Sequence, residues 1–350
     1  MFKKKRILIL IGSTSNEHDV SIVSGINVYN NIPNKYSKDI IYLNKENIGF
    51  IIEKEFEGKE VSFPYVVTIK DEIEDTISYM QQYDLVFPVL HGKFGEDGQI
   101  QKILEENNVK YVGSDSYTSN ICFDKGLTKK ILEGHDILTA KSIIIELDED
   151  FALSNINIEK LKNLNEKIKS EFGYPIFVKP ARSGSSVGVT RVEKFDDLPR
   201  SIIKAFNEDN KILIEEAIDG NEVQCGILEI NSQPITSLIG EIKTLHEFYT
   251  YDSKYIEKED QLYIFNEDKN PELENLEKEI KDLSKRIFGN LGCKDLARID
   301  FFIKDNKIVF NEINTIPGFS KNSMYPWLLI KSGYPYEKIL EILIENNLKK

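Results

Sequence analysis

The sequence predicts an α/β protein with more than one domain. Strand-like runs alternate with helical stretches through the first third of the chain, and the run 84–90, DLVFPVL, is the kind of apolar segment found in parallel sheets covered on both faces. Polar loops that contain glycine follow the expected strands at 12–16 and 91–98, where α/β proteins bind ligands. The 350 residues are enough for two or three domains.

The elements are expected in the following order. The first third has strands at 7–11, 40–43 and 84–90, helices at 20–31 and 99–107, and an uncertain stretch at 48–68. A helix at 117–133 precedes a unit with strands at 142–145, 175–179, 189–192 and 211–215 and helices at 159–172 and 196–207. The remainder has two strands described below, helices at 271–291 and 336–346, and an ordered loop at 246–263. We therefore expect three domains, at 1–120, 121–215 and 216–350.

Composition and charge narrow the function classes. The net charge is −13 and there is no polybasic stripe, which argues against a nucleic-acid partner. Cys122, Cys225 and Cys293 have neither a metal spacing nor a disulfide pattern, so they indicate a reducing compartment. The apolar run after the basic start, MFKKKR, is too short for a signal peptide, and no segment is long enough to span a membrane. We expect a cytoplasmic protein.

The segment 297–314 carries the strongest chemical signal. It is expected to form strands at 297–303 and 308–314, with Arg298, Asp300 and Phe302 on one face of the first. The same alternation puts Ile308, Phe310, Glu312 and Asn314 on one face of the second. A three-residue loop, 305–307, sets Asp300 opposite Glu312, whereas a two-residue turn sets them on opposite faces. Two carboxylates and an amide are oxygen ligands suited to Mg²⁺ that also holds phosphate.

Two further segments indicate a nucleotide site. Lys179 ends a strand and precedes a loop of small residues, 182–188, whose backbone N–H groups can approach phosphate oxygens. No helix follows this loop, so it is a flap over the phosphates rather than a P-loop. The strand-like segment 212–222 offers an exposed backbone for an adenine edge and Glu222 for a ribose hydroxyl.

Taken together, these segments resemble the D-alanine–D-alanine ligases of the ATP-grasp superfamily. The resemblance covers nearly the whole chain, in eight ordered segments: 17–21 (EHDVS), 91–98 (HGKFGEDG), 124–125 (DK), 179–188 (KPARSGSSVG), 215–222, 248–255 (FYTYDSKY), 298–300 (RID) and 311–318 (NEINTIPG). It implies an N-terminal pre-grasp domain, a central lid domain and a C-terminal catalytic domain. It also implies a homodimer whose substrates are ATP and D-alanine.

The implied reaction makes D-alanyl-D-alanine for peptidoglycan precursors. ATP phosphorylates the carboxylate of one D-alanine, and the amine of a second D-alanine attacks the acyl phosphate. The resemblance assigns ATP contacts to Lys125, Lys179, Ser185, Ser186, Glu215, Ala217, Ile218, Glu222 and Lys254. It assigns two Mg²⁺ ions, for which Mn²⁺ can substitute, to Asp300, Glu312 and Asn314.

The resemblance also assigns the amino-acid sites. Arg298 and the N–H of Gly318 are expected to stabilise the tetrahedral oxyanion, a role worth about 3 kcal/mol per donor. Glu17 is expected to take the ammonium of the first D-alanine and His91 to lie near its carboxylate. Ser323 and Met324 are expected to meet the carboxylate of the second. Tyr255, in hydrogen-bonding reach of Ser185 and Glu17, completes the implied catalytic group.

Three positions depart from the usual family pattern. Ser13 replaces the second glycine after the first strand, and we expect it to keep a negative φ. Ser183 replaces a glutamate of the flap, which removes a charge from the closing loop. Thr250 replaces an aspartate in the segment 248–255.

The second substrate is the main alternative left open. Relatives that use D-lactate have histidine at the position of Tyr255, and those that use D-serine place a polar residue at the position of Met324. An apolar Met324 leaves the serine hydroxyl unpaired at about 1–3 kcal/mol, which favours D-alanine. A different carboxylate–amine ligase, a non-catalytic nucleotide sensor and a nicotinamide dehydrogenase are the other readings. A nicotinamide dehydrogenase is expected to have a GxGxxG pattern, which this sequence lacks after its first strand.

Overall fold

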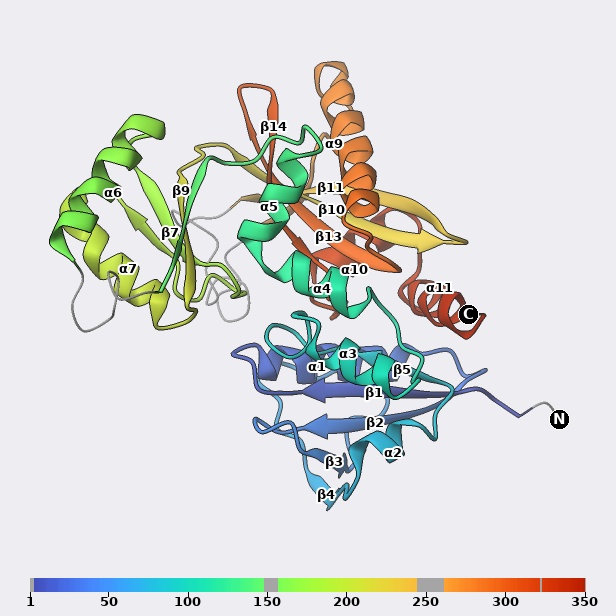
Figure 1. Cartoon of the computed structure of the whole chain (residues 1–350). Coiled ribbons are helices and arrows are strands. Elements are labelled where there is room, and N and C mark those ends of the chain that lie inside the picture. Colours follow the sequence, from blue (N-terminus) through green and yellow to red (C-terminus); the bar gives the residue numbers. More distant parts are fainter. Residues whose placement is uncertain (1–2, 148–156, 244–260, 322, 350) are drawn as a thin grey trace.

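The computed structural model describes residues 3–147, 157–243, 261–321 and 323–349. Their strands form three sheets, two of five strands and one of four. Figure 1 shows the N-terminal sheet below, the four-stranded sheet with α6 and α7 at the upper left, and the C-terminal sheet beside α9. Among these residues no helix is long and apolar enough to cross a membrane.

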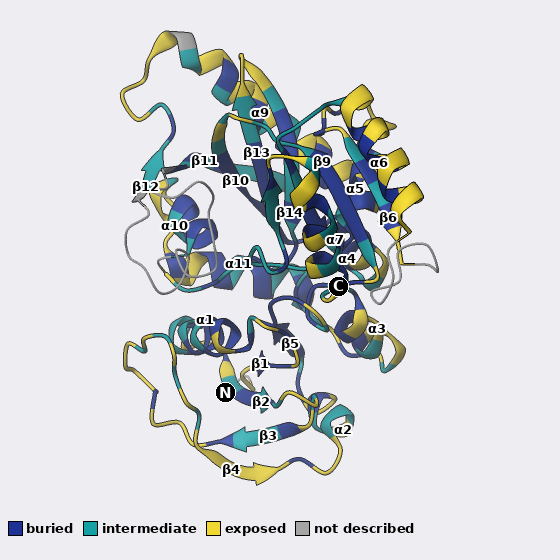
Figure 2. Ribbon diagram, turned by 90° about the vertical axis from the view of Figure 1, so that its left-hand side faces the viewer, coloured by how far each residue is buried: buried dark blue, intermediate teal, exposed yellow. Residues whose placement is uncertain are grey.

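The N-terminal sheet is only partly parallel. Its order is β4-β3-β2-β1-β5, and β1 is parallel to both β2 and β5, whereas β3 and β4 extend the sheet antiparallel. Its elements are β1 (Arg6–Gly12), β2 (Ser37–Leu43), β3 (Gly49–Ile52), β4 (Ile69–Glu72), β5 (Leu85–Pro88), α1 (His18–Asn31), α2 (Thr76–Met80) and α3 (Gln99–Glu106). Ile7–Ile11 are fully buried, as their apolar run predicted, and β4 is an exposed edge (Figure 2).

The turn after β1 differs from the expected backbone conformation. Ser13 has a φ of 85°, in the left-handed region that a serine rarely adopts. Its N–H donates to Leu43 O at 2.7 Å, its hydroxyl donates to Asn47 Oδ1 at 3.0 Å, and its carbonyl oxygen lies 2.5 Å from Nδ1 of His18. These three contacts hold Ser13 in its left-handed conformation. The glycine that is usual at this position would adopt the same conformation without strain.

The helix predicted at 117–133 is interrupted. It is two helices, α4 (Ser116–Phe123) and α5 (Lys125–Glu133), separated by Asp124, whose ψ of 97° is not helical. The Asp124 carboxylate accepts the N–H of Leu127 at 2.9 Å and pairs with Lys211 at 2.8 Å. Asp124 is therefore an N-cap, a role that suits aspartate, and it sets Lys125 at the start of α5.

The central sheet has α6 and α7 on its outer side (Figure 1). Its order is β6-β9-β7-β8, and its strands are antiparallel to their neighbours. Its elements are β6 (Ser142–Glu146), α6 (Ile158–Glu171), β7 (Ile176–Pro180), β8 (Thr190–Val192), the 3₁₀ turn Phe195–Asp197, α7 (Leu198–Phe206) and β9 (Lys211–Glu216). The apolar residues of α6 and α7 fill the core on that side, and Phe177, Lys179 and Glu215 of the sheet line a cleft.

The C-terminal sheet has the order β12-β11-β10-β13-β14. Its elements are β10 (Asn221–Ile230), β11 (Gln233–Lys243), β12 (Gln261–Ile264), α9 (Pro271–Asn290), β13 (Leu296–Lys304), β14 (Lys307–Asn314), α10 (Met324–Lys331) and α11 (Tyr336–Leu348). The sequence did not predict α10, and residues 261–263 of the expected loop belong to β12. Helix α11 packs into the core of the N-terminal sheet, so the two ends of the chain share one core.

The hairpin of β13 and β14 confirms that Asp300 lies opposite Glu312, for a reason the sequence analysis missed. The loop has two residues, Asp305 and Asn306, with φ values of 50° and 58°, rather than three. Phe301 pairs with Phe310 but Asp300 pairs with Glu312, so Asn311 is an extra residue in a β-bulge. The bulge turns Phe310 into the core against Phe301, which corrects the expected face of Phe310.

Candidate active site

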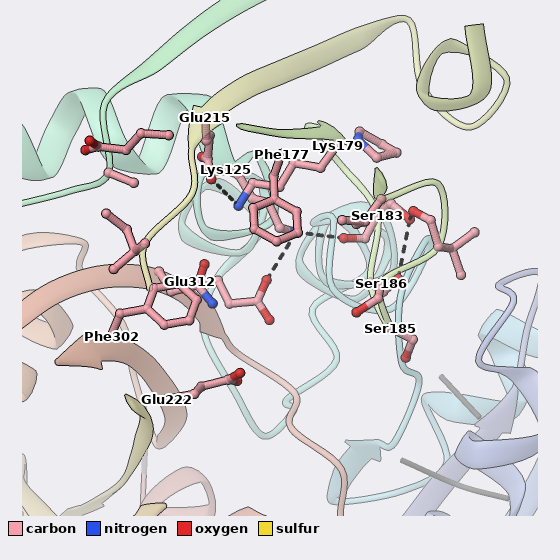
Figure 3. A pocket seen from close by; sticks show the side chains of 18 residues that line it. Lys125, Phe177, Lys179, Ser183, Ser185, Ser186, Glu215, Glu222, Phe302 and Glu312 are labelled. Atoms are coloured by element: carbon pink, nitrogen blue, oxygen red, sulfur yellow. Dashed lines mark hydrogen bonds and ion pairs between the residues drawn. The ribbon is translucent and has the colours of Figure 1, made fainter. Parts of the chain in front are cut away.

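A cleft lies between the central sheet and the C-terminal sheet. Its empty volume is about 910 Å³, counting the open space at its mouth. Figure 3 shows the side chains that surround it. They come from α5, β7, β9, β10, β13, β14, the flap and the segment between β9 and β10, and include Lys125, Phe177, Lys179, Ser185, Ser186, Glu215, Ile218, Glu222, Phe302, Asn311 and Glu312. The cleft therefore gathers most of the residues that were predicted to contact ATP.

Lys125 joins three parts of the cleft. Its ammonium lies 3.3 Å from Glu312 Oε2 on β14 and donates to the carbonyl of Ser183 in the flap at 2.7 Å (Figure 3). The backbone N–H of Lys125 donates to Ala181 O at 3.0 Å, which fixes the start of α5 against the flap. A cation held between a flap and a carboxylate is well placed to meet a phosphate group.

A buried group of three charges lies under the cleft. The Glu215 carboxylate, 4% exposed, contacts the ammonium groups of both Lys129 and Lys179, the latter at 2.5 Å. Burial raises the pKa of Glu215, but the two lysines outweigh it and hold that pKa below its usual value. Burial lowers the pKa of Lys129. Sequence reasoning missed Lys129, although it lies four residues after Lys125 and hence on the same face of α5.

The side of the cleft where adenine was expected to bind is mainly apolar. Phe177, Ile218 and Phe302 line it, and Glu222 is at its edge. The N–H of Ala217 donates to Pro175 O at 3.2 Å, so this backbone group has a partner within the protein. The arrangement suits a flat base between apolar side chains with a carboxylate at one end.

The predicted metal ligands lie on two adjacent strands. Arg298 Nε and Nη2 donate to the two Asp300 oxygens, both at 2.8 Å, and Asp300 is 1% exposed. Asn314 pairs with Arg298 in the strand register, and its Nδ2 is buried without a hydrogen-bond partner in the described part of the chain. Those described residues hold no group of three His, Cys, Asp or Glu side chains arranged for a metal. Two carboxylates and one amide nevertheless fit Mg²⁺, which takes part of its shell from substrate phosphates and water.

The flap reaches the first helix of the chain. Ser185 and Ser186 have φ values of 48° and 59°, and the Ser185 hydroxyl donates to Glu17 Oε1 just before α1. A β-carbon added to Gly184 would lie 2.5 Å from Glu17 Oε2, so glycine permits this close approach. Glu17 and Ser185, which lie 168 residues apart in the sequence and were both expected to contact Tyr255, therefore contact one another.

His91 and Glu96 hold the loop that carries Gly318. His91 Nδ1 lies 2.9 Å from Ile316 O, and Glu96 Oε1 accepts the N–H of Ile316 at 3.3 Å. The other ring nitrogen of His91 is 3.1 Å from the hydroxyl of Ser24, which also accepts the N–H of Phe319 at 3.3 Å. Both ring nitrogens of His91 thus contact protein groups, and burial lowers its pKa. Sequence reasoning included Glu96 in a motif but gave it no role.

The titration of Glu96 leads to a prediction about stability. Burial and the negative charge of Glu17 raise the pKa of Glu96. Hydrogen bonds from the N–H groups of Gly92 and Ile316 lower it, but by less, so the pKa is about 8. An unfolded glutamate titrates near pH 4.3, so between about pH 4.3 and 8 the folded protein retains a proton that the unfolded chain has lost. Glu96 therefore makes the free energy of unfolding fall as pH rises through this window.

Replacing Glu96 with glutamine removes that titration. Urea unfolding at pH 5, 6.5 and 8 should show a smaller loss of stability with pH in E96Q than in the unchanged protein. E106Q, at an exposed position of α3, is the matched control and should keep the original slope. Parallel curves for E96Q and the unchanged protein would contradict the prediction.

The residues predicted for the second amino acid lie at the start of α10. The Ser323 hydroxyl lies 2.8 Å from Ser320 Oγ and accepts the N–H of Ser320 at 3.2 Å. Met324 is buried against Leu328, and a β-carbon on Gly318 would lie 3.1 Å from Ser323 Oγ. Lys254 and Tyr255, with Thr250, lie outside the described residues.

Family models and solved structures agree on what this chain is similar to. The model described as D-ala D-ala ligase N-terminus matches residues 6–114, and the model described as D-ala D-ala ligase C-terminus matches 145–345. The D-alanine–D-alanine ligase of Caldicellulosiruptor bescii is 37% identical, and the alignment covers 99% of this chain and 97% of that protein.

Two solved structures have the same fold. The VanG D-Ala:D-Ser ligase from Enterococcus faecalis is 31% identical with a TM-score of 0.78, over 98% of this chain and 99% of that one. The D-alanine–D-alanine ligase from Bacillus anthracis, solved with ATP, is 28% identical with a TM-score of 0.74, over 99% and 98%. With a cleft that joins a flap, lysines and paired carboxylates, the chain is an enzyme with the ATP-grasp fold and belongs to the D-alanine–D-alanine ligase family.

Proposed function

We propose that this enzyme uses ATP to join two molecules of D-alanine, through a D-alanyl phosphate, for peptidoglycan precursor synthesis. The observation that carries the proposal is the cleft that Lys125, Lys179 and Glu312 line together, with Lys125 3.3 Å from Glu312. Next to it, the flap residue Ser185 contacts Glu17. A phosphoryl donor and a carboxylate acceptor would meet between these two contacts.

The residues divide the chemistry between them. Lys125, Lys179 and Ser186 bind the phosphates of ATP, and the apolar wall with Glu222 binds adenosine. Glu17 orients the ammonium of the first D-alanine. Arg298, whose Nε and Nη2 donate to Asp300, stabilises the oxyanion together with the N–H of Gly318.

The family implies a divalent cation, and we propose that Asp300, Glu312 and Asn314 hold two Mg²⁺ ions. Mn²⁺ is expected to substitute for them. When bound, the cations supply positive charge to the transferring phosphoryl group. Asp300 is paired with Arg298, and Glu312 is paired with Lys125. Each carboxylate oxygen has two lone pairs, so a carboxylate can bind a metal cation and still keep part of its contact with the basic side chain.

D-Serine as second substrate is the alternative that one comparison supports. VanG, one of the similar structures, is a D-Ala:D-Ser ligase. Met324 argues for D-alanine, because a buried thioether offers the serine hydroxyl no strong partner.

We propose that the enzyme is a cytoplasmic homodimer, which the family resemblance supports. We also propose that each chain has the domains 1–120, 121–215 and 216–350, which the three separate sheets support.

Phosphate release from Mg-ATP tests the proposed function. Purified enzyme should release phosphate only when D-alanine is present, and mass spectrometry should identify D-alanyl-D-alanine. A faster yield of the mixed D-Ala-D-Ser product at equal substrate concentrations would favour the alternative. If the rate of ATP hydrolysis were the same with and without each D-amino acid, the proposed substrate would be wrong.

Replacing Gly184 with alanine should weaken D-alanine binding. The new β-carbon would meet Glu17 Oε2 at 2.5 Å, so the carboxylate at the end of the Glu17 side chain would have to move from its present position. We expect KM for D-alanine to rise about tenfold, since a displacement of about 1 Å near the chemistry commonly costs more than that. G289A, in α9 where no atom lies within 4 Å of the added carbon, is the control and should leave KM unchanged. Equal KM values for G184A and the unchanged enzyme would count against this role of the flap.

A further inference from the structure

Gln224 lies in the same row as the predicted metal ligands. In the strand register Gln224 on β10 pairs with Asp300 on β13, and Asp300 pairs with Glu312 on β14. Adjacent strands are about 4.8 Å apart, and residues paired in register point to the same face of a sheet. Three oxygen-bearing side chains therefore stand side by side on three neighbouring strands, and only two of them were predicted from the sequence.

The contacts of Gln224 link it to Asp300. Its Nε2 donates to Asp300 Oδ2 at 3.3 Å, and the residue is 2% exposed. Its Oε1 is buried and accepts no hydrogen bond from any group that the structure describes. On its other side Gln224 pairs with Gly240, where a β-carbon would lie 2.8 Å from Met324 Sδ. An amide is thus packed between the start of α10 and the predicted metal ligand.

A glutamine at this position has a specific effect on its neighbour. Asp300 accepts two hydrogen bonds from Arg298 and one from Gln224, so three donors fix the plane of its carboxylate. Partners that donate to a metal-binding carboxylate orient it, and their loss typically costs about 10–100-fold in metal affinity or activity. The Oε1 of Gln224 is a second polar atom of the same side chain that lies buried beside this carboxylate.

We propose that Gln224 is a positioning residue for the divalent cation. It would hold Asp300 in the orientation that binds the ion. The proposal rests on the proposed function, because it takes Asp300 as a metal ligand. Gln224 would thus be a residue of β10 that affects cation affinity. The sequence analysis assigned only one role to this strand, the ribose contact of Glu222.

Binding of Mn²⁺ in the presence of ADP tests the role without turnover. Free Mn²⁺ is measured by electron paramagnetic resonance as it is titrated into enzyme with saturating ADP. Q224M keeps the length of the side chain but has neither the donor nor the acceptor, and we expect it to bind Mn²⁺ about 10–100-fold more weakly. Q233M, the same change at an exposed site in β11, should match the unchanged enzyme.

Further readouts separate positioning from general damage. ADP affinity in the presence of EDTA and the melting temperature without metal should be the same in Q224M and the unchanged enzyme. If Q224M does not fold, Q224L, which is also neutral and also lacks the N–H donor and the acceptor, takes its place with the same expectation of weaker Mn²⁺ binding. Equal Mn²⁺ affinity in a folded Gln224 variant would overturn the role of Gln224 alone. Failure of the unchanged enzyme to bind Mn²⁺ with ADP would overturn the metal site itself, and this proposal with it.

Discussion

Replacing Glu312 with glutamine is expected to reduce Mg²⁺-dependent phosphate release by at least about 100-fold while the protein stays folded. Glu312 is one of two carboxylates in the candidate metal site, and its side chain is 25% exposed and 3.3 Å from Lys125. Glutamine keeps the shape and one oxygen but loses the charge. Both the cation and Lys125 then lose a partner at the place where phosphoryl charge is neutralised.

The measurement is phosphate release as a function of Mg²⁺ concentration, with circular dichroism to confirm the fold. E279Q on the exposed face of α9 removes the same charge far from the cleft and should retain full activity. Partial recovery of E312Q at high Mn²⁺ would support a lost ligand, because a weakened site refills by mass action. Turnover of E312Q near that of the unchanged enzyme would mean that Glu312 does not bind the cation.

The regular elements were largely predictable because they depend on local pattern. The fully buried strand β1 and the helices α3, α6, α7, α9 and α11 appear close to their expected ranges, since apolar spacing fixes both their type and their buried face. The break between α4 and α5 was missed because Asp124 lies within a helical pattern. Its capping role depends on a carboxylate that also reaches Lys211 on β9.

The hairpin shows how a correct conclusion followed from an incomplete reason. Alternation and a three-residue loop placed Asp300 opposite Glu312, but the chain reaches that pairing with a two-residue turn and a bulge at Asn311. The pair Asp305 and Asn306 is a turn signal, whereas nothing in the local sequence marks the bulge. The buried phenylalanine pair of β13 and β14 fixes the register on the turn side of the bulge.

The residues that were missed are those whose partners come from distant segments. Lys129 acquires its role from Glu215, Glu96 from Ile316, and Gln224 from Asp300. No periodicity links such pairs, because each depends on how two sheets or two loops approach one another. Tyr255 and Lys254 stay predictions, since they lie outside the described residues.

The largest expected effect on stability comes from Glu215. In E215Q the ammonium groups of Lys129 and Lys179 remain buried under the cleft without their shared counter-charge. Removing one partner of a buried ionic group typically costs about 3–5 kcal/mol, a large part of the stability of an ordinary domain. Urea unfolding should therefore show E215Q strongly destabilised, and K129M, which leaves one lysine paired with Glu215, destabilised less.

The double variant K129M/E215Q decides whether charge balance is the cause. If two uncompensated cations destabilise E215Q, removing Lys129 as well should restore part of the lost stability, since only Lys179 is then uncompensated, and the double-mutant cycle should give a favourable coupling energy. A double variant no more stable than E215Q would point to lost packing instead.

The same charge balance is expected to affect nucleotide binding. With Lys129 in place, Glu215 keeps a partner when Lys179 turns toward a phosphate, so K129M should bind ADP more weakly and adenosine equally well. A uniform loss for both ligands would contradict this division of roles.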